Sequence, residues 1–187
     1  MSVARHKQAA SGDEAEAAWH QAQWSSKTDL TEEEKQHIAK HRKEAAEHRA
    51  AAKSLRDAEA SACGGIAEED RDISPFYHRQ DITSVSEIRP GGEWDETRQQ
   101  TEIGARAVFR ALPGVTAEWL QRVADCQIAR AAAVGYEMPE MSYCPLALRG
   151  VKAHVSSTGS GFAMDVTTSD PEVGKEIIVR MQEAAKH

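Results

Sequence analysis

The chain has 187 residues and a mass of 20.5 kDa, enough for one ordinary domain, or a small domain with a helical appendage, and too short for two full-sized enzyme lobes. Its 40% hydrophobic and 28% charged residues are typical of a globular protein with a modest core. The net charge of -7 argues against nucleic-acid binding through a general basic field. No apolar run is long enough to span a bilayer, and residues 1–10 are too polar for a secretory signal.

The first third of the chain is predicted to be helical, because it is rich in Ala, Glu, Lys, Arg and Gln. A first helix from about Asp13 to Trp24 should break at the two serines that follow. A second should begin at Thr31, where Glu34 completes a capping-box pattern, and should end at the glycine pair after Cys63.

We therefore expect a helical hairpin over residues 1–62. At about 1.5 Å per residue, the second helix would be about 45 Å long, more than one small domain covers. This length predicts that the helix projects or packs against another copy, so we expect a homodimer.

One stripe of the second helix repeats with heptad spacing and carries His41 and His48 between Ile38, Ala45 and Ala52. Two interpretations stay open. Neutral imidazoles one or two turns apart can share a metal ion and titrate near neutral pH. Alternatively, histidine is only a tolerated polar residue on a weakly packed helix face.

The middle segment, residues 63–101, is predicted to be an acidic connector that contains the first strand, Thr83 to Arg89. Between Glu68 and Glu102 there are 10 acidic and 4 basic residues, interrupted by proline and glycine turns. Acidic, turn-rich composition of this kind favours a connection around a short strand over a packed domain.

The last part, residues 102–187, is predicted to be an α+β domain. Alternating apolar residues indicate strands, helical spacing indicates helices, and Asp170 followed by Pro171 is a helix start. The predicted segments are a strand at 102–112, a helix from Thr116 to about Gly135, strands at 151–157 and 162–168, and a final helix. The chain should thus be α+β: a long N-terminal helical hairpin followed by a ββαββα antiparallel-sheet sandwich with both helices on one face.

The densest group of soft metal ligands lies after the first of these helices. Met138, Met141 and Cys144 recur at three-residue intervals, and Cys126 lies on the helix that leads to them. Thiolate and thioether sulfur favours Cu(I) over hard cations, so these four residues form the leading candidate metal site. A Cys126–Cys144 disulfide and plain hydrophobic packing are the alternatives.

Catalytic patterns are weak in this chain. The sequence has no glycine-rich phosphate loop, no GxSxG and no HExxH, and any chain with three cysteines and eight histidines offers Cys-His pairs. An enzyme is therefore the weaker interpretation.

The most distinctive strings are CGGI at Cys63 to Ile66, DRDISPFYH at 70–78 and Cys-Pro-Leu from Cys144. With these the chain, from about Thr31 to Ala185, resembles a group of uncharacterised secreted proteins of Gram-negative bacteria with CxGI, DRDxSPFxH and Cys-Pro-Leu segments. The resemblance implies a periplasmic or cell-envelope location and a role in metal or redox stress.

The chain departs from that group at two positions. Gln127 follows Cys126, and Tyr136 follows Gly135, where the group has histidine. If those histidines are ligands in the relatives, the corresponding site here is reduced.

A second candidate metal group combines His41 and His48 with Cys63 and His78. The competing interpretation is that residues 71–74 form a hydrogen-bonded turn that docks a helix on the sheet. We expect a periplasmic soft-metal protein, with copper as the metal, that sequesters or senses it. The alternative is a non-catalytic envelope interaction module with structural cysteines.

Overall fold

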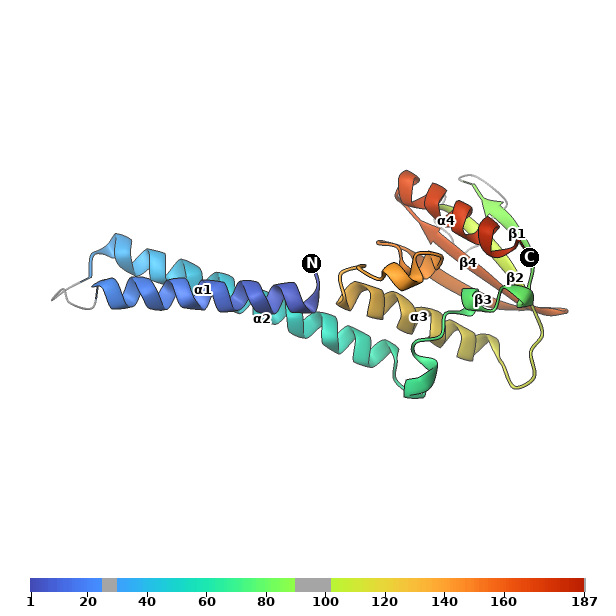
Figure 1. Cartoon of the computed structure of the whole chain (residues 1–187), viewed down its shortest axis with the longest axis horizontal. Helices are drawn as coiled ribbons and strands as arrows, with labels where there is room; N and C mark the ends of the chain where they lie inside the picture. The colour runs from blue at the N-terminus through green and yellow to red at the C-terminus, as the bar shows by residue number, and fades with distance from the viewer. Residues whose placement is uncertain (25–29, 90–101, 187) are drawn as a thin grey trace. The chain divides into compact units, whose positions relative to one another are not determined.

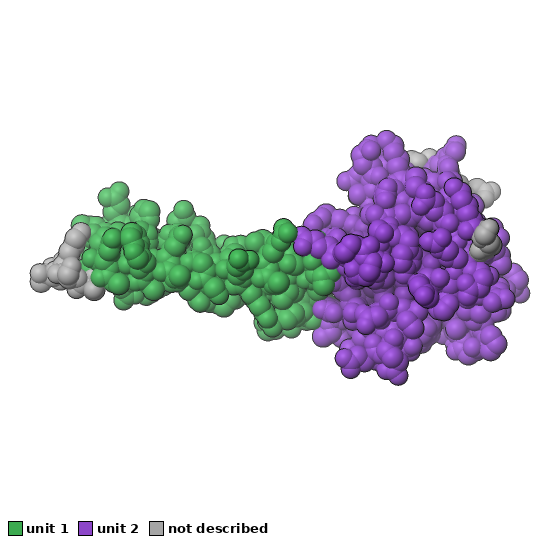
Figure 2. Space-filling model, viewed as in Figure 1, with its two compact units in different colours: residues 1–58, 133–135 green, residues 59–132, 136–187 purple. Residues whose placement is uncertain are grey.

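The computed structural model describes residues 1–24, 30–89 and 102–186 (Figure 1). The chain divides into two compact units, one of residues 1–58 and 133–135 and the other of residues 59–132 and 136–187 (Figure 2). The α+β class is confirmed: a long helix pair is followed by a four-stranded antiparallel sheet with helices. None of the helices in the described ranges has the length and apolarity needed to cross a membrane.

The first unit is a hairpin of α1 (Val3–Trp24) and all but the last turn of α2 (Glu32–Ala62) (Figure 1). The predicted start of the first helix at Asp13 is wrong by ten residues. Ser2 caps the helix, since its Oγ accepts a hydrogen bond from the backbone N–H of Arg5 at 3.2 Å. Gly12 lies inside α1.

The predicted start of the second helix is confirmed. The backbone N–H of Glu34 donates to Thr31 Oγ1 at 3.2 Å, and that of Thr31 donates to the Glu34 carboxylate at 2.8 Å, which is a complete capping box. The helix ends just before Cys63 and two glycines, and Gly65 has a φ of 78°.

The hairpin seam is built from small side chains. Ala10 and Ala17 of α1 are buried, as are Ala45 and Ala52 of α2, together with Ile38. The buried stripe of α2 is the one that the heptad pattern predicts. Alanine lets two helices approach closely but removes little apolar area from water, so packing in this seam stabilises the pair only modestly. Because α1 of the same chain covers the stripe, the homodimer stays a prediction.

The sheet of the second unit has the order β1-β2-β4-β3, with all neighbours antiparallel. Its strands lie within two residues of the predicted bounds: β1 (Ile82–Ile88), β2 (Ile103–Arg110), β3 (Lys152–Thr158) and β4 (Gly161–Thr168). Residues 90–101 of the expected acidic connector lie outside the described residues.

Two helices complete this unit, α3 (Ala117–Ala133) and α4 (Pro171–Ala184). As predicted, Asp170 caps α4, accepting hydrogen bonds from the backbone N–H groups of Glu172 and Val173. One core joins both helices to alternate residues of the central strands, which places both helices on the same face of the sheet. Its members include Ala107, Phe109, Phe162, Met164, Val166, Leu120, Ala124, Ile177 and Met181.

Strand β3 is an edge strand, and the side chain of Gln121 on α3 covers part of that edge. Its amide NH2 donates to the carbonyl of Ala153 at 3.1 Å, and its amide oxygen accepts from the backbone N–H of Val155 at 2.7 Å. The primary amide thus supplies one donor and one acceptor, as a neighbouring strand would.

Two glycine substitutions test these packing arguments. A Cβ on Gly104 of β2 would lie 1.9 Å from the carbonyl oxygen of Val166 on β4, so Gly104→Ala should destabilise the domain by about 3 kcal/mol or more. A Cβ on Gly12 meets nothing within 4 Å, so Gly12→Ala should stabilise α1 by about 1 kcal/mol. Urea unfolding followed by circular dichroism measures both, and equal effects of the two variants would contradict the assignment.

Candidate metal centre

The hairpin carries five of the eight histidines of the chain, and they face one another across the two helices. His6 and His20 lie on α1, and His37, His41 and His48 lie on α2. Four of them occupy partly buried seam positions between the alanines, while His37 is exposed beside the seam. Heptad spacing on each helix therefore brings imidazoles from both helices together.

One group with metal-ligand spacing consists of His20, His37 and His41. One ring nitrogen of each lies within 4.8 Å of the others, a spacing at which one ion could contact all three. The rings of His20 and His41 are stacked, with centroids 5.7 Å apart and an interplanar angle of 16°. The ring centroids of His20 and His37 are also 5.7 Å apart.

Carboxylates surround the same point. The Nδ1 atom of His41 lies 3.7 Å from Asp13, 3.3 Å from Glu16 and 3.6 Å from Glu44. Asp13, His41 and Glu44 also form a second group with metal-ligand spacing. The negative charges would strengthen binding of a cation beside His41.

Two buried nitrogen atoms in this cluster have no hydrogen-bond partner within the described chain, Nδ1 of His20 and Nδ1 of His41. The carboxylate oxygens near His41 are close enough for an ion pair but do not meet hydrogen-bond geometry. A buried polar atom without a partner costs about 1–3 kcal/mol. The hairpin therefore holds unsatisfied ligand atoms that a cation or a proton would satisfy.

The indole of Trp24 covers one side of this group. Its ring centroid lies 4.7 Å from that of His20, and the Trp19 ring lies 4.9 Å away, edge-on. Apolar cover lowers the local dielectric constant and excludes water, which strengthens charge–ligand interactions.

A separate histidine pair lies along the seam, where the Nδ1 atoms of His6 and His48 are 3.0 Å apart. Only one of two facing nitrogens can carry a proton in such a contact. Burial of His6, then the charge of His48 and that of the amino terminus, lowers the pKa of the His6 imidazole.

The predicted sulfur site has lost one of its thiols in this structure. Cys126 forms a disulfide with Cys63, and Cys144 is the free, buried cysteine. The alternative Cys126–Cys144 disulfide is therefore wrong: the turn after α2 brings Cys63, and not Cys144, against Cys126 on α3. A disulfide sulfur is not a thiolate, so Cys126 offers no such ligand in the oxidised chain.

The other members of the sulfur group lie in the core of the second unit. Met141 and Cys144 are buried there, and Met138 packs against it. The Cys144 thiol lies 3.1 Å from Ser74 Oγ, and burial raises the pKa of this thiol. A neutral, hydrogen-bonded thiol of this kind is a poor nucleophile. A sulfur site of these residues stays a prediction for the reduced protein.

The residues of the second predicted metal group lie in two different units of the fold. His41 and His48 both lie on α2 in the hairpin, but His41 is part of the cluster with His20 and His37, and His48 is part of the separate pair with His6. Cys63 and His78 belong to the second unit. Cys63 is consumed by the disulfide, and His78 is exposed after the second of three short 3-10 turns. This group therefore lacks the thiolate on which its soft-metal character rested.

The DRDISPFYH string forms a hydrogen-bonded turn, as its competing interpretation expects, and the turn is held on α3; that it docks a helix on the sheet stays a prediction. Arg71 donates to the carbonyl of Ile66, Asp72 pairs with Arg130 of α3, and Gln127 donates to the carbonyl of Arg71 at 2.6 Å. Gln127 thus has a structural role: its buried side chain holds the turn on α3.

Sequence reasoning missed His20 and Asp13, and it placed His37 and Glu44 beside the histidine stripe of α2 without selecting them as ligands. The signal was available only in part: α1 repeats His6, Ala10, Asp13, Ala17 and His20 with the same heptad spacing as α2. The relative register of two antiparallel helices decides which of these residues meet, and that register is not readable from one sequence.

Comparison with known proteins adds no assignment. No protein-family model matches the chain, and neither a curated protein nor a solved structure gives a significant match.

The disulfide assignment has a direct test. Alkylation of the denatured, unreduced protein should label Cys144 alone, and peptide mapping should recover Cys63 linked to Cys126. The double variant Cys63→Ala/Cys126→Ala should lose about 4 kcal/mol of unfolding free energy, because the bond closes a loop of 63 residues. A Cys126–Cys144 peptide would contradict the assignment.

The lowered pKa of His6 predicts a pH-dependent hairpin. Below the ordinary histidine pKa of about 6.5, the unfolded chain binds a proton that folded His6 resists, so stability falls as the pH drops. Thermal unfolding between about pH 8 and pH 5.5, with a chelator present, should show this loss. His6→Gln should reduce the slope, whereas His154→Gln, on exposed β3, should leave it unchanged.

Proposed function

We propose that this protein binds a divalent transition metal between the helices of its hairpin and holds or senses the ion without turnover. The observation that carries the proposal is the convergence of His20, His37 and His41 from two helices, with two buried nitrogens unpaired. Imidazole suits Zn²⁺, Cu²⁺ and Ni²⁺, and nearby carboxylates add charge without excluding these ions.

The ligand spacing supports such an ion after a small adjustment. Zinc binds imidazole nitrogen at about 2.0–2.1 Å, which places tetrahedral ligands about 3.4 Å apart. The three nitrogens lie within 4.8 Å of one another, so side-chain rotations that move them by about 1 Å would bring them to zinc-ligand spacing. Asp13 or Glu44 could supply a fourth ligand to an ion bound at His41.

A periplasmic or secreted location belongs to the same proposal. The buried Cys63–Cys126 disulfide supports it, because such bonds persist in oxidising compartments and are rare in the cytosol. In that setting the metal would meet the histidine cluster rather than the sulfur group, whose Cys126 is already oxidised.

The alternative function, an envelope interaction module with structural cysteines, also has an observation in its favour. The Cys63–Cys126 bond is buried against Ile66 and Val123 and ties an irregular segment to α3, which is a structural role. Loss of all metal binding, with the fold intact, would leave this alternative.

Metal binding is tested by titrating the purified, unreduced protein with Zn²⁺ and with Cu²⁺ against a competing chelator. One ion per chain is expected. His20→Gln, His37→Gln and His41→Gln should each weaken binding at least tenfold, the lower end of the roughly 10–100-fold loss seen even for residues behind the ligands. The exposed His154→Gln is the matched control and should bind normally.

Two results would overturn the assignment. If His154→Gln and the three cluster variants bind the metal with equal affinity, the ion binds elsewhere on the chain. The second result has two parts: the oxidised protein binds neither Zn²⁺ nor Cu²⁺, and the reduced protein binds Cu(I) in a way that Cys126→Ser abolishes. That result would make the sulfur group the metal site.

A further inference from the structure

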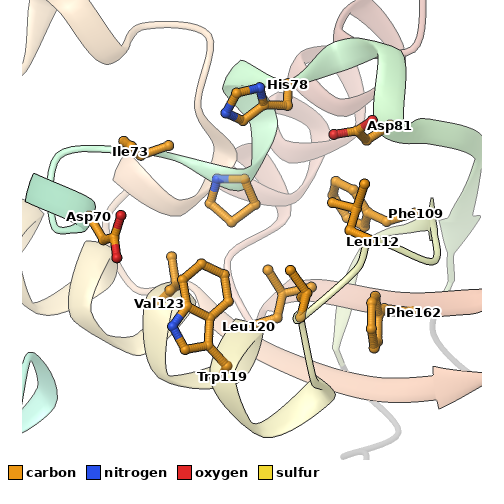
Figure 3. A pocket seen from close by; sticks show the side chains of 12 residues that line it. Asp70, Ile73, His78, Asp81, Phe109, Leu112, Trp119, Leu120, Val123 and Phe162 are labelled. Carbon is orange, nitrogen blue, oxygen red and sulfur yellow. The ribbon is translucent and has the colours of Figure 1, made fainter. Parts of the chain in front are cut away.

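The second unit contains a pocket that the metal proposal does not use. Its volume is about 340 Å³, and it lies between the 3-10 turns at 70–81, the end of β2, the start of β4 and the first half of α3 (Figure 3). Most of its wall is apolar, formed by Ile73, Pro75, Phe109, Leu112, Val115, Trp119, Leu120, Val123 and Phe162. This volume and lining are typical of sites that bind small molecules.

Three ionisable residues complete the lining, Asp70, His78 and Asp81 (Figure 3). Asp81 is nearly buried and is neutralised by Arg110, whose Nε donates to its carboxylate at 2.7 Å. The carboxylate of Asp70 makes no hydrogen bond or ion pair within the described residues, so it carries an uncompensated negative charge at the wall. Figure 3 shows it across the pocket from Phe109 and Phe162.

The pocket is held in shape by contacts behind its walls. Val123 lies beside the Cys63–Cys126 disulfide, and Phe76, directly after Pro75, is fully buried against Phe109 with ring centroids 5.7 Å apart. A wall fixed by a covalent bond and a buried aromatic pair loses little conformational freedom when a ligand enters, which favours binding.

We propose that this pocket binds a small molecule with an aromatic or apolar body and a single cationic amine. The apolar wall would take the body, the faces of Phe and Trp side chains would stack on a ring, and the Asp70 carboxylate would pair with the ammonium group. The net charge of -7 on the chain favours approach of a cation over an anion.

Three probes that share a phenylethyl body and differ in the charge of the end group separate the contributions: 2-phenylethylamine (cationic), 3-phenylpropanamide (neutral) and 3-phenylpropanoate (anionic). Calorimetry and amide chemical shifts of the full-length, unreduced protein should rank the amine tightest and the carboxylate weakest, with shifts at Trp119 and Leu120. No binding of any probe, or tighter binding of the carboxylate, would overturn the proposal.

Variants then test which residue pairs with the ammonium group and whether the apolar body binds in this pocket. Asp70→Asn should weaken the amine about fivefold and leave the neutral amide unchanged, whereas Glu69→Gln, the adjacent exposed carboxylate outside the lining, should change neither. Leu112→Trp should fill the pocket and abolish binding of all three probes. If Asp70→Asn binds the amine with unchanged affinity, Asp70 does not recognise the ammonium group. If a folded Leu112→Trp variant binds the probes normally, they do not bind in this pocket. Because the amine requires no metal, these outcomes are independent of the hairpin site.

Discussion

The attachment of one irregular segment to one helix is the constraint on which the second unit depends. Residues 63–81 contain three short 3-10 turns and make few regular hydrogen bonds of their own, so they need external anchors. α3 supplies them along a single face, through the disulfide at Cys126, the amide of Gln127 and the guanidinium of Arg130. Ser74 and Phe76 then place the end of the segment in the core.

This attachment explains why the cysteines have structural roles. Cys63 and Cys126 fix the segment to the helix, and Cys144 lies under the segment, where its thiol meets Ser74. The same contacts shape one wall of the apolar pocket, since Ile73, Pro75 and His78 belong to the attached segment. Covalent anchoring and pocket formation are thus two results of one arrangement.

The hairpin, in contrast, is held by few apolar contacts. Its seam buries alanines and leaves polar rings and a carboxylate between them, which gives close helix contact but little hydrophobic stabilisation. A seam of leucines would hold the helices more firmly but would offer no ligand atoms. Buried imidazole nitrogens without partners also cost stability, so this seam holds the two helices less firmly than a seam of leucines would.

Much of the fold could be predicted from local patterns. Capping residues, hairpin glycines and alternation located the start of α2, the four strands and α4 to within two residues, and the buried stripe of α2 followed from its heptads. What failed depended on contacts distant in sequence. The pairing of Cys63 with Cys126 required knowledge of which turn reaches α3, and the histidine cluster required the register between two helices.

Gln121 has a consequence for how the sheet meets other molecules. An exposed edge strand is a template on which a foreign strand can add, and such addition is a common route to aggregation. At the centre of β3 the Gln121 amide already occupies the donor and the acceptor that an incoming strand would need. Strand addition there would first have to pull a side chain of α3 away from the edge, so this helix protects the sheet from growth while it also forms part of the core.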